Sequence, residues 1–190
     1  MSLINVAESG PTLTKTAGCS GCPDGTAVSN QQVSGSGMLQ FSTDDSSTLR
    51  FVGLGSNGIG TTPSDVNFAI RLQAGVAEVR EFGTYKSEIG FGAGDTFTIT
   101  VSGSVVSYAK NGGVFYTGSA STGAALRAHV IFFDTSGSVR NVGFGGGAAP
   151  SADAPSTVTS PTVGAGTAAT GQYAVPRPAS SKPKRKKAHY

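Results

Sequence analysis

The stretch GDTFTITVSGSVVSYAKNGGVFYT, residues 94–117, decides the fold of this chain. Its first part alternates apolar residues with threonines, which is typical of a strand with one buried face. The Ser-Gly-Ser sequence that follows is a turn former, and Asn111-Gly112 is the strongest short-range signal for a hairpin. The stretch therefore predicts an antiparallel meander of three strands, at 96–101, 105–110 and 114–116.

The same signals continue on both sides of this meander. Short apolar or alternating runs are separated by polar, glycine-rich connections, with turns every 8–12 residues or so, and no long run has the period of a helix. This pattern predicts about ten strands in an all-β antiparallel sandwich or jelly roll. The further strands are expected within 4–16, where Gly10-Pro11 interrupts an edge strand, and at 27–33, 38–41, 49–54, 68–72, 76–82, 126–133 and 138–144, with loops at 57–63 and 83–92.

The composition changes near residue 145. With 37% hydrophobic and 13% charged residues and 28 glycines, the chain suits one sandwich core with many turns. From 146 onward the sequence is rich in Ala, Ser, Thr, Pro and Gly and has no periodicity. Such a segment buries too little apolar surface to offset the entropy of ordering. We therefore expect a sandwich domain at 1–145 and a disordered linker at 146–190.

The central stretch also carries a family resemblance. After Gly94-Asp95, the residues Val106, Tyr108 and Tyr116 frame the pattern V-x-Y-x-K-N-G-x-x-x-Y. This pattern resembles the late strands of SPRY-type domains, which belong to the concanavalin A-like lectin and glucanase superfamily. The resemblance implies a sandwich that recognises glycans or protein surfaces. Further segments that resemble the group lie at 13–16, 27–29, 35–37 and 52–54, so that the resemblance covers residues 4–144.

Positive charge is concentrated at the end of the sequence. Residues 1–149 contain 8 Lys+Arg and 10 Asp+Glu, a net charge of −2, whereas residues 150–190 contain 6 Lys+Arg and one Asp, a net charge of +5. The basic cluster predicts sequence-independent binding to nucleic acid or another polyanion. A nuclear-import-like address or simple solvation of the terminus are the alternatives. The cluster consists of Lys182, Lys184, Arg185, Lys186 and Lys187.

Catalytic chemistry is not indicated. Glycosidases of this fold need two carboxylates on one strand face, but Glu78 and Glu81 are three residues apart and point to opposite faces of a regular strand. His129 lies in the most apolar run, 126–133, which predicts a buried structural histidine. No GxSxG, P-loop or dinucleotide fingerprint is present. The sequence predicts no enzyme, no cofactor and no metal site.

Five residues are candidates for ligand contact. Tyr85, Tyr108 and Tyr116 are amphipathic rings that suit an aromatic platform for sugars, although both Tyr108 and Tyr116 also fit a core position. Asp134 and Asn141 flank the last predicted hairpin and can hold a ligand, but turn formation explains them equally simply.

Cys19 and Cys22 form a CxxC motif in a loop dense in turn formers. A redox site would need the motif to open a helix, which Pro23-Asp24-Gly25 disfavours. A zinc site would need two further ligands, and no second CxxC or CxxH occurs. A local disulfide or two free thiols are the interpretations that remain.

The sequence shows no classical signal peptide and no apolar segment long enough to span a membrane, so a soluble protein is expected and its compartment is left open. The function predicted is a non-enzymatic recognition module that binds glycan or protein surfaces through loops of the sandwich. The alternative is a coat or surface-assembly protein, in which a jelly roll packs against copies of itself and the basic tail contacts nucleic acid.

Overall fold

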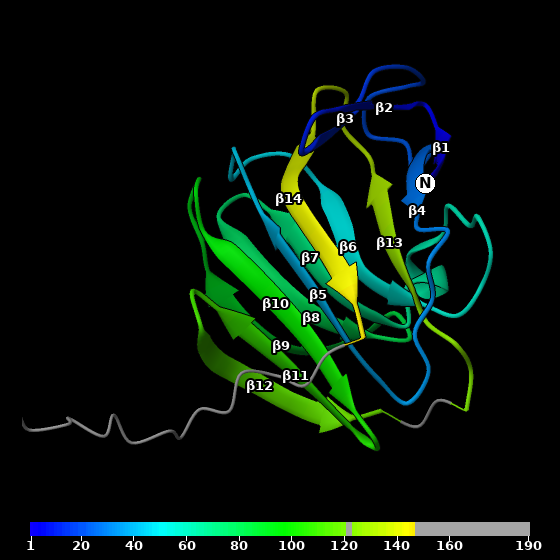
Figure 1. The fold of residues 1–190 in the computed structure, drawn as a ribbon. Coiled ribbons are helices and arrows are strands. Elements are labelled where there is room, and N and C mark those ends of the chain that lie inside the picture. The colour runs from blue at the N-terminus through cyan, green and yellow to red at the C-terminus, as the bar shows by residue number, and fades with distance from the viewer. Residues whose placement is uncertain (121–122, 147–190) are drawn as a thin grey trace, which may run out of the picture. The chain divides into compact units, whose positions relative to one another are not determined.

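The computed structural model describes residues 1–120 and 123–146, which form two facing antiparallel sheets (Figure 1). Sheet A has the order β1-β4-β13-β6-β7-β8-β9, and sheet B has the order β12-β11-β10-β5-β14-β3-β2. The predicted all-β antiparallel sandwich is thus confirmed. Sheet A contains β1 (Ser2–Ile4), β4 (Gly25–Val28), β6 (Arg50–Gly55), β7 (Phe68–Gln73), β8 (Val76–Glu81), β9 (Thr84–Gly90) and β13 (Arg127–Phe132). Sheet B contains β2 (Val6–Ser9), β3 (Thr12–Lys15), β5 (Ser36–Ser42), β10 (Thr96–Ser102), β11 (Val105–Lys110), β12 (Gly113–Ser119) and β14 (Ser138–Gly145).

The predicted central meander is confirmed, because β10, β11 and β12 pair in sequence order. Asn111 and Gly112 both have positive φ, 50° and 83°, as a type I′ turn requires. The Asn111 carboxamide fixes the turn further: its Oδ1 accepts from the Thr96 N–H at 2.9 Å, and its Nδ2 donates to Asp95 Oδ1 at 2.7 Å.

Gly112→Val is expected to lower the free energy of unfolding by about 1 kcal/mol. No atom lies within 4 Å of the position that its Cβ would take, so the cost comes from the backbone at φ 83° and not from a clash. Chemical denaturation should compare this variant with Gly113→Val, a neighbouring exposed position without positive φ. A Gly112→Val variant as stable as the wild type would show that the register is set elsewhere.

The core fills the space between the sheets and consists of the inward-facing residues of both. Phe41 and Phe97 stack there with ring centroids 5.5 Å apart. The alternating runs expected from the sequence supply one buried residue at every second position. In β10 these are Phe97, Ile99 and Val101, and in β7 they are Phe68, Ile70 and Leu72.

One expected loop is a strand. The loop expected at 83–92 is instead β9, an edge strand of sheet A in which Ile89 is the residue packed against the core. Because β9 is largely exposed, it lacks the apolar alternation that marks a strand in sequence. The N-terminal edge strand is interrupted at Gly10-Pro11 as expected, which separates β2 from β3 in sheet B. The sequence did not predict that β1 precedes them as a separate strand of sheet A, ending just before Asn5 (φ 54°).

The loop at 56–67 packs on the outer face of sheet A, where Val66 joins a small apolar cluster and Gly60 lies over His129. His129 has no exposed surface, which confirms its expected structural role. Its Nε2 lies 2.9 Å from the Gly60 carbonyl oxygen and 3.1 Å from Thr26 Oγ1. Burial lowers the pKa of His129, so the ring is neutral at pH 7.

Cys19 and Cys22 form a disulfide, which agrees with the local interpretation of the CxxC motif. The loop that contains both cysteines surrounds the ammonium group of Lys15. The residue Lys15 is only 1% exposed, although lysine is rarely buried in proteins. Lys15 Nζ donates to the carbonyl oxygens of Cys19 at 2.6 Å and Cys22 at 2.9 Å. A buried cation therefore organises this loop.

Candidate functional site

The five predicted ligand residues do not gather at one site. Tyr108 and Tyr116 lie next to each other on the inner side of β11 and β12. Tyr85 lies on β9, Asp134 lies in the loop between β13 and β14, and Asn141 lies in β14.

Tyr108 is completely buried and takes the core position that the sequence also allowed. The period of β11 places it on the same face as Val106, toward the core. Its hydroxyl donates to Glu81 Oε1 at 3.4 Å, and its ring centroid lies 5.7 Å from that of Tyr116. Burial and then the Glu81 carboxylate raise the pKa of Tyr108, so its hydroxyl stays protonated. Tyr116 is half-buried against the same core cluster.

Asp134 and Asn141 both make contacts that shape the backbone. Asp134 Oδ2 accepts from the Leu49 N–H at 2.6 Å, which ties the β13–β14 loop to the chain entering β6. Asn141 has φ 52° in a bulge of β14, and its N–H donates to the Pro11 carbonyl oxygen at 2.8 Å. The two residues serve different loops and do not share a ligand site.

Of the three candidate tyrosines, Tyr85 is the one that the structure leaves exposed. It is 47% exposed, and the β8–β9 pairing sets it directly opposite Arg80. The Arg80 guanidinium carbon lies 5.5 Å from the centroid of the Tyr85 ring, within the range of a cation–π interaction.

Arg80 links this ring to further charged side chains on the neighbouring strands. Glu78 accepts from Arg71 Nη1 at 2.9 Å through one oxygen and from Arg80 Nε at 2.8 Å through the other. Pairing places Arg71 and Glu88 opposite Glu78 on the two neighbouring strands. Arg71, Glu78, Arg80 and Glu88 alternate with the inward-facing residues and so lie on the outer face of sheet A. The β8–β9 register shifts between Val79 and Arg80, and this shift brings Tyr85 to the same face, opposite Arg80. We call this set the Tyr85 site: Arg71, Glu78, Arg80, Tyr85 and Glu88.

The two arginines offset a repulsion within the Tyr85 site. Glu78 and Glu88 are like charges in directly opposite positions, an unfavourable pair without the two arginines. The ion pairs are partly buried, since the side chains of Arg71, Glu78 and Arg80 are 22%, 15% and 29% exposed. Partial desolvation and the Glu88 and Glu78 carboxylates raise the pKa of Tyr85, so its hydroxyl keeps its proton and remains a donor. Two cations and two anions balance, which leaves a neutral polar surface around an exposed ring.

Sequence reasoning identified Tyr85 but missed its neighbours. The alternation of 76–81 already puts Glu78 and Arg80 on one face, opposite to Glu81, and the structure confirms this. The missing information was that 84–90 is a strand, because only its pairing brings Tyr85 and Glu88 to that face.

The basic residues Lys182, Lys184, Arg185, Lys186 and Lys187 lie outside the described residues, as does the expected linker, so the division of the chain and the polyanion contact stay predictions. Within residues 1–120 and 123–146, no three His, Cys, Asp or Glu side chains gather closely enough to hold a metal ion. In the same part of the chain, no helix has the length and apolar character needed to cross a membrane.

No protein-family model and no curated protein sequence matches this chain. Solved structures do match. The SPRY domain of human HERC1 has 20% sequence identity and a TM-score of 0.56, with 73% of this chain and 92% of that domain covered. A second human SPRY domain has 15% identity and a TM-score of 0.56, with coverages of 74% and 96%. The alginate lyase AlgAT5 of polysaccharide lyase family 7 has 13% identity and a TM-score of 0.46, with coverages of 72% and 69%.

The matches to the two SPRY domains show the fold. The chain is a β-sandwich with the architecture of SPRY domains, as the sequence resemblance implied. At such identities the likeness says nothing about the ligand, which has to be argued from the side chains.

Proposed function

We propose that this chain is a non-enzymatic recognition module that binds glycans at the Tyr85 site. The observation that carries the proposal is the half-exposed Tyr85 ring, framed by charged side chains that already hold one another in place. A pyranose ring has an apolar face of C–H groups that stacks on an aromatic ring. Its hydroxyl groups donate to carboxylates and accept from guanidinium groups, both of which the site presents.

Two properties of the Tyr85 site favour a neutral sugar. The charges of Arg71 and Arg80 are balanced by those of Glu78 and Glu88, so an ionic ligand gains no net attraction. The ion pairs fix the side chains before binding, so less conformational entropy is lost when a ligand arrives.

Glu78 and Glu88 place two carboxylates on one face, which is also what a hydrolase of this fold would use. One of the pair would have to act as a general acid with a free oxygen aimed at the glycosidic bond. Both oxygens of Glu78 are occupied by arginine N–H groups. Glu78 is therefore not available as the general acid, so a hydrolase would have to use Glu88 in that role.

Tyr85→Ala is expected to weaken binding to neutral oligosaccharides by about tenfold or more, equivalent to about 1.4 kcal/mol. Tyr85→Phe keeps the stacking surface and should weaken binding only about twofold to threefold, since it loses one hydroxyl contact. A glycan array should select the ligand, and calorimetry should then compare both variants with Thr117→Ala, an exposed position on β12.

The melting temperature of each variant checks that the sandwich is intact. Equal affinity of wild type and Tyr85→Ala for every glycan would refute the site. Release of reducing sugar would show that the chain hydrolyses glycans and does not only bind them. Tyr85-dependent capture of a protein that carries no glycan would show that the site recognises a protein surface. Large regular particles on size-exclusion chromatography would favour the assembly alternative.

A further inference from the structure

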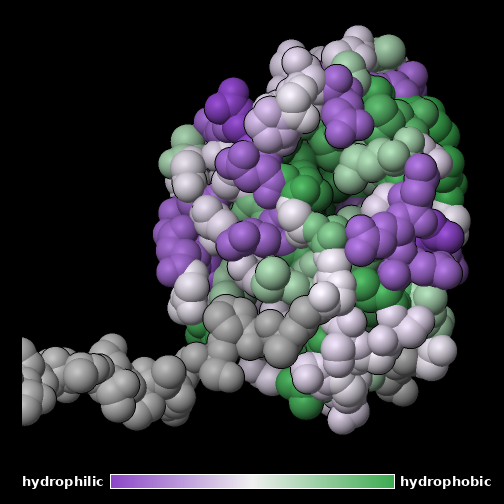
Figure 2. Space-filling view, viewed as in Figure 1, coloured by the Kyte–Doolittle hydropathy of each residue, from purple (hydrophilic) through white to green (hydrophobic). Residues whose placement is uncertain are grey.

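The loop at 56–67 lies over the outer face of sheet A, and its tip covers a buried histidine (Figure 1). We call residues 57–61, which form this tip, the flap. Asn57, Gly58 and Ile59 in the flap are exposed. Figure 2 shows a cluster of strongly hydrophilic residues on the side of the molecule where the loop lies in Figure 1, as expected of a surface in contact with solvent.

The end of the loop is anchored more firmly than the flap. Val66 is completely buried in the small apolar cluster, and the Asn67 carbonyl oxygen accepts from the Phe82 N–H at 2.7 Å. Among the hydrogen bonds between described residues, one alone joins the flap to the sheets. It runs between His129 Nε2 and the Gly60 carbonyl oxygen at 2.9 Å. His129 therefore decides whether the flap is closed.

The contacts of His129 fix which of its ring nitrogens carries the proton. The Gly60 carbonyl oxygen only accepts, so Nε2 has to be the donor. Thr26 Oγ1 lies 3.1 Å from the same nitrogen and donates its own hydrogen to the Val130 carbonyl oxygen, which leaves this assignment unchanged. The neutral ring thus has a bare Nδ1, which is buried and has no hydrogen-bond partner among the described residues.

A second proton on His129 is unfavourable while the flap is closed. It would bind to Nδ1, which faces β6 at Gly55, only 3.1 Å from the position that a Cβ would take there. The new N–H would be a buried donor without an acceptor in the described part of the chain. Burial lowers the pKa of His129 and outweighs the opposing effects of the Gly60 carbonyl group and the Asp65 carboxylate. An open flap removes this burial, so the ring then takes up a proton with the ordinary pKa of about 6.5.

The other charged groups near the ring do not titrate with it. Asp65 faces His129 from the loop, and its hydrogen bonds with Thr62 lower its pKa, so this carboxylate stays ionised at pH 5. Arg127 lies two residues along β13 and donates to the carbonyl oxygens of residues 29 and 30. β4 and β6 place uncharged residues next to the ring.

We propose that the flap is a pH-sensitive lid, which His129 holds closed at neutral pH and which opens when the histidine takes up a proton in acid. The closed form has its full stability above about pH 6.5 and loses it as the pH falls from there toward the lowered pKa of the closed form. The ratio of open to closed flap is expected to be about thirtyfold higher at pH 5 than at pH 7.4. The lid does not depend on the proposed function of the Tyr85 site.

The test follows the distance between the flap and sheet A in the full chain. A nitroxide is attached to the variant Ile59→Cys, a position that is 47% exposed in the flap. The two native cysteines are joined in a disulfide, so the label reacts with the new thiol. The nitroxide broadens the NMR signals of Thr26 and Gly55 while the flap is closed. This broadening should fall steeply between pH 7.4 and pH 5.

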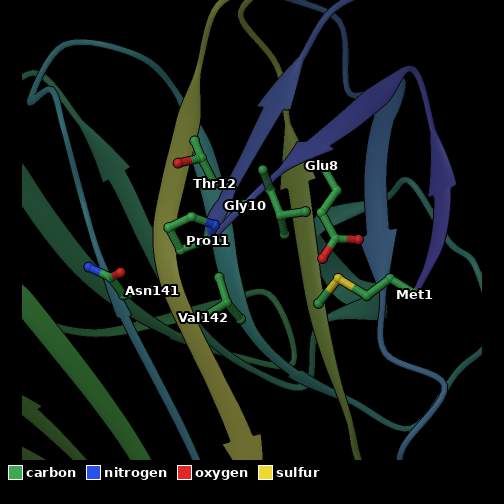
Figure 3. A pocket seen from close by; sticks show the side chains of 8 residues that line it. Met1, Glu8, Gly10, Pro11, Thr12, Asn141 and Val142 are labelled. Carbon is green, nitrogen blue, oxygen red and sulfur yellow. The ribbon is translucent and has the colours of Figure 1, made fainter.

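Two further substitutions in the labelled chain show whether His129 causes the change. His129→Gln keeps an N–H that can donate to Gly60 but does not titrate, so its open-to-closed ratio should change less than twofold over the same range. Glu8→Gln is the control, since it removes an exposed carboxyl group on β2, beside Met1 (Figure 3), and should respond as the wild type does.

Broadening that stays constant down to pH 5 in the labelled wild type overturns the proposal, and so does an equal pH response in His129→Gln. The melting temperature shows whether His129→Gln is folded. If it is not, the imidazole signals of His129 in the wild type decide the question. Their titration has to share its midpoint with the loss of broadening, and separate midpoints contradict the lid.

Discussion

Lys15→Met is expected to lower the free energy of unfolding by about 2–3 kcal/mol, because it removes the buried charged donor that several backbone carbonyl groups share. Lys15 Nζ donates to the carbonyl oxygens of Cys19 at 2.6 Å, Cys22 at 2.9 Å and Phe133 at 2.6 Å, and it contacts the Asp24 carboxylate. Met has a volume similar to that of Lys, so the lost stability measures the effect of removing the charged ammonium group. The three carbonyl groups and the carboxylate would be left without their donor.

Chemical denaturation measures the effect, and the Cys19→Ser, Cys22→Ser double variant is the comparison. A disulfide that closes so short a loop constrains the unfolded chain little, so the double variant should be far less destabilised than Lys15→Met. Similar losses in both would mean that the disulfide, and not the buried ammonium group, holds the loop.

The pH dependence provides a second readout for Lys15. The hydrogen bond from Lys15 lowers the pKa of Asp24 below its ordinary value of 3.8. A carboxyl whose pKa is lowered in the folded state stabilises the fold above its ordinary pKa, and this stabilisation is lost as the pH falls further. The loss of stability below pH 3.8 should therefore be shallower in Lys15→Met than in the wild type.

Gly53→Ala should destabilise the sandwich by about 3 kcal/mol, at the upper end of the usual cost of overpacking. Gly53 lies in the middle of β6, paired with Ala69 of β7 and His129 of β13. A Cβ there would collide with the carbonyl oxygen of Phe68 and would lie 2.7 Å from Ala69 Cα and 2.8 Å from Val66 Cγ1. Two of these obstacles are backbone atoms of a paired strand, which cannot move away as a flexible side chain can.

Gly58→Ala is the matched control for Gly53→Ala. It makes the same change in the loop at 56–67, where no atom lies within 4 Å of the new Cβ. Its stability should stay within about 0.5 kcal/mol of the wild type. If Gly53→Ala unfolds at the same denaturant concentration as Gly58→Ala, β6 and β7 do not approach each other at Gly53 as closely as the structure shows.

The strands that sequence reasoning located correctly are those with one buried face. In β7 and β10 every second residue is apolar, and in the β11–β12 turn Asn111-Gly112 supplies the positive φ that two-residue hairpins need. These signals are local, so each can be read from about ten neighbouring residues. β9 was not predicted as a strand, because an exposed edge strand does not need to alternate apolar and polar residues.

The candidate site was predictable only in part for the same reason. Tyr85 could be named as an amphipathic ring, and Glu78 and Arg80 could be placed on one face by their spacing. Which strand lies beside them could not be read from local sequence, and neither could the opposition of Glu78 to Glu88. For Tyr108 the sequence left a ligand role and a core role open, because an isolated Tyr does not show whether its hydroxyl has a buried partner such as Glu81.

The sequence by itself determined the all-β class, the central meander, the buried position of His129 and the opposite orientation of Glu78 and Glu81. All of these follow from interactions between residues close in the chain or from the period of a strand. The tertiary structure was needed to establish the order of the strands in each sheet and the charged side chains that accompany Tyr85. It was also needed to establish the burial of Lys15 against Phe133, which lies 118 residues away in the chain. Pairing between distant strands depends on how two sheets bury their apolar faces together, and that is a property of the whole chain rather than of any one stretch.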